Sequence, residues 1–400
     1  MRCLVGLDDT DSSRGLCTTY LGYRIAAALS PDIKVLPYPR LVRLNPNIPF
    51  KTRGNAAVCL KVETSDPGRA FELLSSKMDE LSDVRGGANP AMVFLEDPSR
   101  SPSFAGLYRA ALTGVVSPHR VRRLLEAEGI RRYESGNGMG VVGAASALAF
   151  DESFDHTYEL ISYRRKENWG SKREIGSSSV TAMDRRTFPH TFNNYDYQKR
   201  RVLVAPHGPD PVFAGVRGDS PAAVVSAFGQ LEYEEQLDGY MVYVSNQHTD
   251  AHVRSKLEWK AYASGWVDGT VESVQFGPGG HAYLALSSDG DKRMVAAYEP
   301  TGDLRRAVGL LEKGDEIRAY GGVRRHTSLH PAILNLERMD VVNLHGTRGR
   351  ILSKGTYVSS PRSNRHLTKP LSRIGREVYG AQAEIGGWLS ASSRLQRALA

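Results

Sequence analysis

The sequence predicts an α/β protein made of several domains, and three observations carry this prediction. Its 400 residues with 40% hydrophobic content are enough to form two to four cores. Apolar runs of strand length alternate with apolar residues at helical spacing through roughly the first 170 residues. In the second half, short strand-like runs follow one another between glycine-rich turns.

Residues 1–175 are predicted to form an α/β domain. An apolar run at Arg2–Leu7 has the length of a strand, and a polar loop and apolar residues at helical spacing follow it. Two more strands are expected at 56–62 and 91–95. The helix between them would bury one face, formed by Phe71, Leu74, Met78 and Leu81.

Residues 176–255 are predicted to form a small α+β domain. A strand at 201–205 is followed by a Pro- and Gly-rich turn, a helix at 221–229 and a strand at 240–244. This β-α-β order is typical of a ferredoxin-like sandwich.

Residues 256–341 have the rhythm of an OB-fold barrel. Five short strand-like runs are expected, and one helix, at 303–311, follows the third of them. A partly open, five-stranded barrel of this kind is much used to bind single-stranded nucleic acid. The expected strands are 269–275, 281–286, 293–298, 316–320 and 333–336.

Basic residues are concentrated in the C-terminal segment, residues 342–400. Ten Lys or Arg stand against two acidic residues in 341–400, and this excess of eight equals the net charge of the whole chain. Such a segment releases counterions when it binds a phosphate backbone, but it is equally typical of a solvated tail. Charge alone leaves both interpretations open.

Targeting and cysteine patterns favour a cytoplasmic protein without a membrane partner. No stretch has the roughly 18 apolar residues of a membrane span, and the N-terminus has no signal-peptide pattern. Cys3, Cys17 and Cys59 include no C-x-x-C pair. They are expected to be reduced, and no zinc is expected.

The strongest local feature is an acidic turn directly after the first strand. Asp8, Asp9 and Asp11 place three carboxylates in four positions, where they repel one another unless a cation lies among them. Because Mg²⁺ binds one or two carboxylates together with substrate phosphates, this turn, with Thr10 and Ser12, is a candidate magnesium–ATP site. The alternative is an acidic helix N-terminus, since carboxylates also stabilise the positive end of a helix dipole.

Two hydroxyl residues favour the nucleotide interpretation. Thr18 and Thr19 open the next predicted helix, where free backbone N–H groups hold phosphate. The chain has no G-x-x-x-x-G-K-[ST] loop, so ATP would bind by a less common cradle.

The stretch Gly136, Asn137 and Gly138 either passes close to phosphates or only permits close helix packing, and the pattern by itself favours packing.

A polar stretch from Val244 to His252 precedes the predicted barrel. Its amide and imidazole groups, among them Asn246, Gln247 and His252, suit contacts to RNA base edges. The alternative is an ordinary solvated loop, since loops are polar in general.

Taken in order, these motifs resemble the archaeal tRNA-isoleucine 2-agmatinylcytidine synthetase family along nearly the whole chain. Their order carries the resemblance more than any single motif does. The motifs are Gly-Leu-Asp-Asp-Thr-Asp-Ser at 6–12, Cys-Thr-Thr-Tyr at 17–20, Arg53-Gly54-Asn55, Gly136–Gly138, Pro189–Asp196, Pro206–Pro211, Ser245–Gln247 and His366–Leu371.

The resemblance implies an N-terminal kinase-like domain, a ferredoxin-like domain, an OB-fold and a C-terminal zinc ribbon. This chain departs from that pattern because no cysteine follows Cys59, so a thiolate zinc site is excluded. Either the basic segment, with residues such as Arg365 and Lys369, takes over part of the ribbon's tRNA contact, or the tRNA is held in another way.

The resemblance also implies the reaction. ATP would phosphorylate the C2 oxygen of the wobble cytidine in CAU-anticodon isoleucine tRNA, and agmatine would then displace the phosphate. Asp8, Asp9 and Asp11 would hold Mg²⁺ beside the transferred group. Thr18 matches the position that becomes phosphorylated from ATP in the family, and Asn55 falls in the expected nucleotide site.

Substrate contacts can be assigned only by position and chemistry. A cytosine flipped out of the anticodon needs an aromatic partner, for which Trp169, Phe192 and Tyr195 are candidates. The guanidinium of agmatine needs a carboxylate or carbonyl partner. Asp196 and Asp210 are candidates for this role, and their alternative role is that of turn residues.

Two other functions stay open. One is a non-catalytic OB-fold RNA-binding protein, which would not turn over ATP. The other is an ATP-dependent enzyme on the same scaffold that modifies another RNA or uses another amine.

Overall fold

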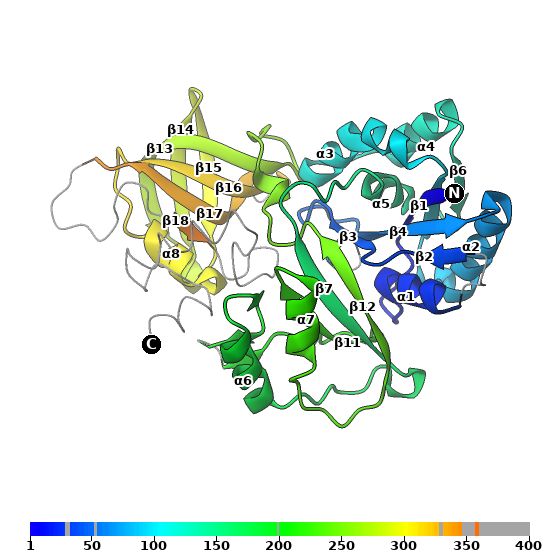
Figure 1. The fold of residues 1–400 in the computed structure, drawn as a ribbon. Helices are drawn as coiled ribbons and strands as arrows, with labels where there is room; N and C mark the ends of the chain where they lie inside the picture. Colours follow the sequence, from blue (N-terminus) through cyan, green and yellow to red (C-terminus); the bar gives the residue numbers. More distant parts are fainter. Residues whose placement is uncertain (29–32, 52–53, 198–199, 328–330, 346–356, 360–400) are drawn as a thin grey trace. The chain divides into compact units, whose positions relative to one another are not determined.

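The computed structural model describes residues 1–28, 33–51, 54–197, 200–327, 331–345 and 357–359 (Figure 1). Its contacts divide the chain into two compact units. The first contains Met1–Leu44, Phe50–Tyr195 and Arg201–Gln247, and the second contains Asn45–Pro49, Asp196–Arg200 and His248–Ala400. Arg53, Arg365, Lys369 and nearly all of the basic C-terminal segment therefore lie outside the described residues.

A ten-stranded sheet runs through the first unit. Its order is β6 (Arg131–Glu134), β5 (Ala91–Leu95), β1 (Arg2–Asp8), β4 (Ala56–Thr64), β3 (Arg40–Arg43), β12 (Leu237–Ser245), β7 (Thr157–Arg164), β11 (Val212–Gly218) and β8 (Thr191–Phe192), with β2 (Ile33–Val35) also paired to β4. Among these strands, neighbours are antiparallel except β3 and β12, which are parallel.

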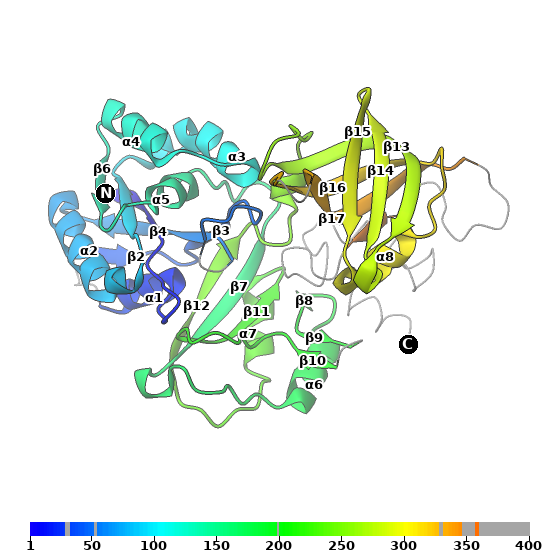
Figure 2. The same ribbon diagram turned by 180° about the vertical axis from the view of Figure 1, so that it is seen from behind.

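Helices cover both faces of the sheet (Figures 1 and 2). α1 (Thr18–Ala28) and α2 (Pro67–Leu81) bury apolar residues against one face, and α3 (Ala105–Thr113), α4 (Pro118–Ala127) and α5 (Val141–Ala147) against the other. α2 starts where the Asp66 side chain accepts a hydrogen bond from Arg69 N and Pro67 occupies the first turn. α6 (Ser177–Thr187) and α7 (Pro221–Phe228) pack together near β7 and β11.

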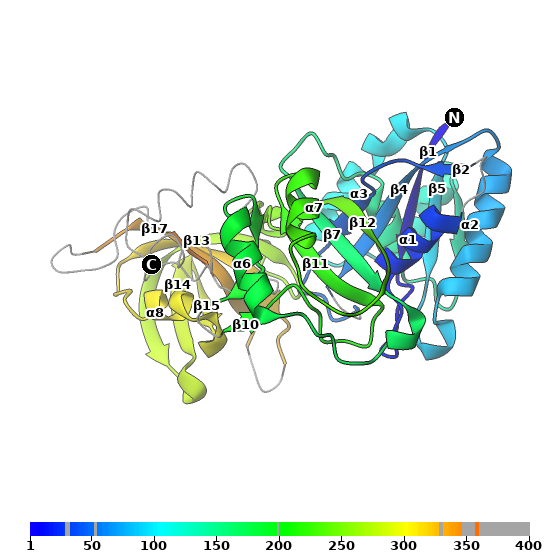
Figure 3. The same ribbon diagram turned by 60° about the horizontal axis from the view of Figure 1, so that its bottom comes forward.

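The second unit contains a closed five-stranded barrel (Figure 3). β13 (Ser264–Phe276) pairs with β14 (Ala282–Ser288) and β16 (Glu316–Arg324), and β15 (Asp291–Ala297) pairs with β14 and, in parallel, with β17 (Ile333–Asn343). The β16–β17 pair closes the barrel. α8 (Asp303–Val308) lies between the third and fourth strands, and β18 (Tyr357–Ser359) adds to β17.

Short elements complete the described chain. They are η1 (Val84–Gly86), η2 (Pro98–Phe104), η3 (Lys166–Asn168), η4 (Ala251–Val253), η5 (Pro278–Gly280), η6 (Glu299–Thr301), β9 (Tyr195–Asp196) and β10 (Arg201–Val202). None of the described helices combines the length and the apolar character that crossing a bilayer demands.

The structure confirms a multi-domain α/β chain and a five-stranded barrel with one helix after its third strand. The strand predicted at 201–205 is wrong beyond its first two residues, because the long strand is β11, on the other side of the Pro206–Pro211 turn. β11 lies inside the sheet and buries Phe213 and Val216, whereas β10 has only two residues. The predicted division at residue 175 falls within this sheet, since β7 precedes it and its neighbours β11 and β12 follow it.

Candidate active site

The candidate nucleotide residues gather at one edge of the large sheet. β1 ends at Asp8, which pairs with Ala91 at the start of β5, and Ala91 in turn pairs with Glu134 at the end of β6. β1 also pairs with β4, with Leu7 opposite Val58. The acidic turn after β1, the Gly136–Gly138 stretch after β6 and Asn55 before β4 therefore lie at the same edge.

Backbone hydrogen bonds and one carboxylate fix the shape of the acidic turn. Asp9 has a positive φ of 57°, and Ser12 and Gly15 exchange backbone hydrogen bonds of 3.0 and 3.3 Å. Asp83 holds the turn from its place just before η1, since it accepts hydrogen bonds from Ser12 Oγ at 2.6 Å and Arg14 Nε at 3.0 Å. The hydrogen bonds from Arg14 and Ser12 lower the pKa of Asp83 to about 2.

The two threonines predicted to open α1 lie next to this turn. Thr18 and Thr19 are buried, and Thr10 Oγ1 donates a hydrogen bond of 3.2 Å to Thr18 Oγ1. The Thr19 carbonyl accepts hydrogen bonds from Tyr163 at 2.9 Å and Tyr243 at 2.7 Å. These contacts fix the start of α1 against β7 and β12.

Burial and neighbouring charges raise the pKa values of Asp8 and Asp9. Burial, and then the charge of Asp9, raise the pKa of Asp8 well above its usual value, and burial together with Asp11 raises the pKa of Asp9 to about 6. No ion pair among the described residues involves Asp8 or Asp9. The two carboxylates are thus held where a cation would stabilise their ionised forms.

The structure does not gather Asp8, Asp9 and Asp11 into one ready-made metal site. Within the described part of the chain, no group of three or more His, Cys, Asp or Glu side chains is placed to hold a metal ion. Mg²⁺ takes only one or two carboxylates when substrate phosphates supply other ligands, so magnesium binding at this turn stays a prediction.

Asn89 is part of this site, and sequence reasoning missed it. Its backbone N–H donates to the Asp9 carbonyl at 3.1 Å, and its side chain bonds the Asp9 carboxylate. Its Oδ1 accepts a hydrogen bond of 3.1 Å from the backbone N–H of Asn137. Asn89 therefore connects the acidic turn to the glycine-rich stretch. The sequence feature that could have identified it is its position just before the apolar strand that begins at Ala91.

The glycine-rich stretch packs closely in the structure, which is the role that the sequence pattern favoured, and its contact with phosphates stays a prediction. Gly136 and Gly138 have φ of 62° and 64°, which favours glycine, and the turn they form leads into α5. Arg122 clamps this turn through Glu134, at 2.6 Å, and the Asn137 carbonyl, at 2.8 Å.

α5 also packs directly on the acidic carboxylate. A Cβ built at Gly140 would lie 2.7 Å from the Asp8 carbonyl, and one built at Gly143 would overlap Asp8 Oδ2. Glycine at positions 140 and 143 therefore lets α5 pack closely on β1 and, at the same time, leaves room for the Asp8 carboxylate.

The raised pKa of Asp9 makes stability depend on pH in a defined direction. Between pH 3.8 and about 6 the folded state keeps a proton on Asp9 that the unfolded state has released, so the free energy of unfolding falls as pH rises through this window. Each unit of pKa shift corresponds to about 1.4 kcal/mol. In thermal unfolding without nucleotide, we expect Asp9→Asn to gain stability relative to wild type from about pH 4 to 6. A difference independent of pH would contradict this.

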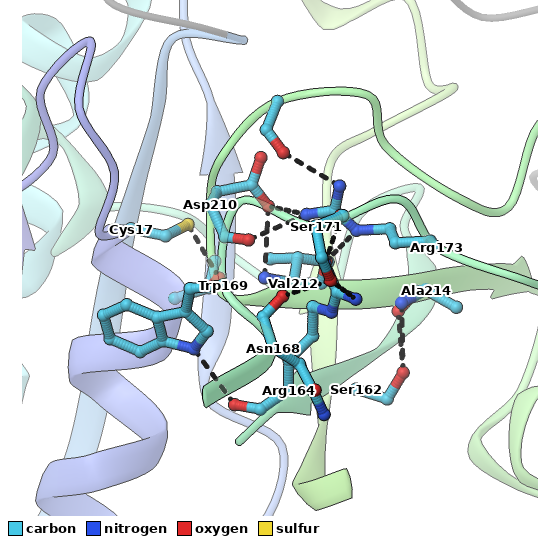
Figure 4. A network of polar contacts seen from close by, with 12 residues as sticks. Cys17, Ser162, Arg164, Asn168, Trp169, Ser171, Arg173, Asp210, Val212 and Ala214 are labelled. Atoms are coloured by element: carbon cyan, nitrogen blue, oxygen red, sulfur yellow. Dashed lines mark hydrogen bonds and ion pairs between the residues drawn. The ribbon is translucent and has the colours of Figure 1, made fainter. Parts of the chain in front are cut away.

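Two of the predicted substrate residues lie near the start of the first helix: Trp169 packs against α1, and the loop of Asp210 lies near the acidic turn. Trp169 packs edge-on against Tyr20 of α1 at a centroid distance of 5.3 Å. Its indole N–H donates to the Arg164 carbonyl at 3.2 Å (Figure 4). The loop that carries Asp210 also approaches the acidic turn, since the Pro209 carbonyl lies 3.5 Å from a Cβ built at Gly15.

Asp210 already holds a guanidinium group, that of Arg173 (Figure 4). Arg173 donates to the carbonyls of Gly208 at 2.8 Å, Asp210 at 2.7 Å and Val212 at 2.6 Å, and its Nη2 lies 3.4 Å from Asp210 Oδ1. Only 6% of the Asp210 side chain is exposed. Its contact with agmatine stays a prediction, and in this structure the carboxylate stabilises the loop.

The remaining predicted residues are more dispersed. Phe192 is fully buried in β8, and Asp196 belongs to the second unit. Asn246 is buried, exchanges hydrogen bonds with the backbone of Arg43 at 2.7 and 2.9 Å, and donates to Tyr108. Gln247, also buried, accepts a hydrogen bond from Arg43 Nε at 2.8 Å.

These contacts join β12 to β3, so the burial of Asn246 and Gln247 has a structural cause. His252 is buried in the second unit, 2.9 Å from Glu337. Contact of Asn246, Gln247 or His252 with tRNA stays a prediction.

The fold and the site define a class of protein: a multi-domain α/β protein with a five-stranded barrel and an acidic, glycine-lined edge suited to nucleotide chemistry. Two family models match the chain, the TiaS TCKD domain over residues 4–70 and the TiaS FLD domain over 138–252. The isoleucine-tRNA 2-agmatinylcytidine synthetase TiaS of Cenarchaeum symbiosum is 36% identical, over 94% of this chain and 93% of that protein.

Solved structures agree with this likeness. The crystal structure of TiaS with its isoleucine tRNA and ATP has a TM-score of 0.83 at 31% identity, over 93% of this chain and 97% of that chain. The complex of TiaS with the same tRNA, AMPCPP and agmatine has a TM-score of 0.81 at the same identity and coverage. The chain belongs to the TiaS family.

Proposed function

We infer that this protein is an ATP-dependent ligase that replaces the C2 oxygen of the wobble cytidine in CAU-anticodon isoleucine tRNA with agmatine. The product, 2-agmatinylcytidine, pairs with A instead of G and changes codon reading from AUG to AUA. One observation carries the inference: the chain matches, over 93% of its length, structures of a TiaS protein with isoleucine tRNA and ATP, and with agmatine.

The chemistry explains why ATP is needed. The C2 carbonyl of cytosine resists attack by an amine, and its oxygen is a poor leaving group. Phosphorylation converts that oxygen into a phosphate, which departs when the primary amine of agmatine bonds to C2. The protein's contribution is mainly positioning and stabilisation of the charge that develops on the phosphoryl group.

Asp8 and Asp9 would hold Mg²⁺ within this proposal, with Asp11 next to them. Their raised pKa values come from burial and from neighbouring carboxylates, and a bound cation would favour their ionised forms. When bound, Mg²⁺ neutralises charge on the nucleotide phosphates. Thr10, Ser12, Thr19, Asn55 and Gly136–Gly138 line the same edge and are proposed to contact ATP, and Thr18 is proposed to accept a phosphoryl group.

The finer domain assignments also belong to the proposal. The strands around β1 would form a kinase-like part, and β7, β11 and β12 with α6 and α7 a ferredoxin-like part. The barrel and the basic C-terminal segment, with Arg365 and Lys369, would contribute to tRNA binding. Trp169 is the proposed aromatic partner of the flipped cytosine, because it lies beside α1.

A direct assay tests the function. Incubation with ATP, Mg²⁺, agmatine and CAU-anticodon isoleucine tRNA is expected to give a heavier wobble cytidine by mass spectrometry of the digested tRNA. Thr18→Ala and Asp9→Asn are expected to give no adduct. Putrescine in place of agmatine separates this enzyme from a modifier that uses another amine, and an unmodified nucleoside at saturating substrates would reject the inference.

A further inference from the structure

A row of charged side chains continues the candidate site across the middle of the large sheet. Arg43 ends β3, Glu159 lies on β7, and Arg217 on β11 pairs with Glu159. Since alternate residues of a strand share a face, Arg43 and Glu159 lie on the same face as Leu41 and Ile161, which pack in the core beneath α1. The row therefore lies on the side of the sheet where α1 begins.

The charges in this row do not balance. Glu159, whose side chain is 4% exposed, lies 2.9 Å from Arg217 Nη2 and 3.4 Å from Arg43 Nη2. One carboxylate thus faces two guanidinium groups. Arg217 Nε is buried without a hydrogen-bond partner among the described residues. Burial lowers the pKa of Arg43. The negative charge of Glu159 raises this pKa, and the positive charge of Arg217 lowers it. This is the pattern expected where two guanidinium groups share one carboxylate.

Arg43 is also the member of the row nearest to the proposed phosphoryl site. It pairs with Ala56 at the start of β4, which places it at the same edge as Asp8. Its side chain is 26% exposed, and Nη1 lies 2.6 Å from a Cβ built at Gly54. Cys17, one residue before Thr18, is close enough to influence the pKa of Arg43.

Neighbouring groups hold the guanidinium in place. Gln247 accepts from Nε at 2.8 Å, and Glu159 accepts from Nη2. These contacts use one side of the guanidinium and leave Nη1 directed along the edge, towards Gly54. A side chain fixed in this way loses little conformational freedom when it binds an anion.

We propose that Arg43 is a further catalytic residue of phosphoryl transfer, which donates hydrogen bonds to oxygens of the transferred group, and that Glu159, Gln247 and Arg217 position it. This proposal rests on the proposed function. In the transfer, the bond from phosphorus to the nucleotide oxygen breaks and its electron pair leaves with the nucleotide, while a bond from phosphorus to the acceptor oxygen forms. Arg43 stabilises the negative charge on the oxygens that stay bound to phosphorus.

The test measures tRNA agmatinylation by the full-length chain with ATP and Mg²⁺. Wild-type activity establishes the function independently, so its absence would reject the function and not the role of Arg43. We expect Arg43→Ala to lower kcat by roughly a hundredfold or more, with a smaller change in KM for ATP. Guanidinium ion at tens of millimolar, well below denaturing levels, should restore part of the lost rate, roughly tenfold.

Arg40 provides a matched control on the same strand. Its side chain binds Glu152 at 2.9 Å and the Leu148 carbonyl at 3.0 Å, away from Glu159 and Gln247. Arg40→Ala should keep a kcat within about threefold of wild type and show no rescue by guanidinium. Wild-type kcat in Arg43→Ala, or a loss equal to that of Arg40→Ala without rescue, would overturn the proposal.

A conservative variant covers the case in which Arg43→Ala does not fold. Arg43→Lys keeps a positive charge beside Glu159 but cannot make the forked contact. We expect its kcat to fall about tenfold while thermal unfolding stays close to that of wild type. If Arg43→Lys keeps the wild-type kcat, the proposal fails.

Discussion

Asp8→Asn is expected to remove nearly all agmatinylation activity while leaving the fold intact. The substitution replaces a carboxylate with a neutral group of the same shape, at a position where burial and Asp9 already raise the pKa. The fold therefore loses no favourable charge interaction, and thermal unfolding without nucleotide should occur at the wild-type temperature or above it. The rate should fall roughly a thousandfold, because charge on the phosphates is no longer neutralised.

The decisive measurement pairs activity with ligand-induced stabilisation. ATP with Mg²⁺ should raise the unfolding temperature of wild type but not of Asp8→Asn. Asp66→Asn is the matched control, because it removes one carboxylate at the N-terminus of α2, where asparagine caps as well as aspartate. If ATP and Mg²⁺ stabilise Asp8→Asn as much as they stabilise wild type, this carboxylate does not hold the cation.

Gly143→Ala is expected to lower both activity and stability. One methyl group at this position of α5 would overlap Asp8 Oδ2, so the carboxylate must rotate away or the helix must move from β1. A second constraint comes from Gly6, because a Cβ there would overlap the Ala144 carbonyl and the helix cannot easily shift along the strand. We expect activity to fall at least tenfold and stability by about 1–3 kcal/mol.

Gly106→Ala separates this steric effect from the general consequence of replacing a glycine. Gly106 lies in α3, and nothing approaches within 4 Å of a Cβ built there. Alanine at this site should keep full activity and raise stability by up to about 1 kcal/mol, since it favours helix more than glycine does. If ATP raises the unfolding temperature of Gly143→Ala as much as that of wild type, the alanine methyl group does not displace the Asp8 carboxylate, and the steric argument fails.

The parts of the fold that local pattern determines were predictable from sequence. The barrel strands and α8 follow from short apolar runs between glycine-rich turns, and β1, β4 and β5 from apolar runs of strand length. α8 ends at Val308, before Gly309, and not at residue 311. β11 was not predicted, because its glycine-containing sequence follows a Pro- and Gly-rich turn and becomes a strand only where β7 and β8 pair with it.

The candidate site was predictable only where its residues are close in sequence. The acidic turn with Thr18 and Thr19 could be found because residues 8–19 hold all of its groups. Arg43 meets Glu159, and Asn89 meets Asp9, only through strand pairing, and no local pattern specifies that pairing. A charged residue inside an apolar strand, such as Glu159, was the one signal that a buried partner must exist.

The parallel pairing of β3 with β12 bears on how the protein must form during synthesis. Val244 and Ser245 pair with Arg40 and Leu41, which stand far earlier in the chain. On the ribosome, the free edge of β3 stays without its partner until residue 245 has emerged, and contacts so distant in sequence are slow to form. The nascent chain thus carries an open strand edge through a large part of its translation, and that edge is where misassembly or chaperone capture would begin.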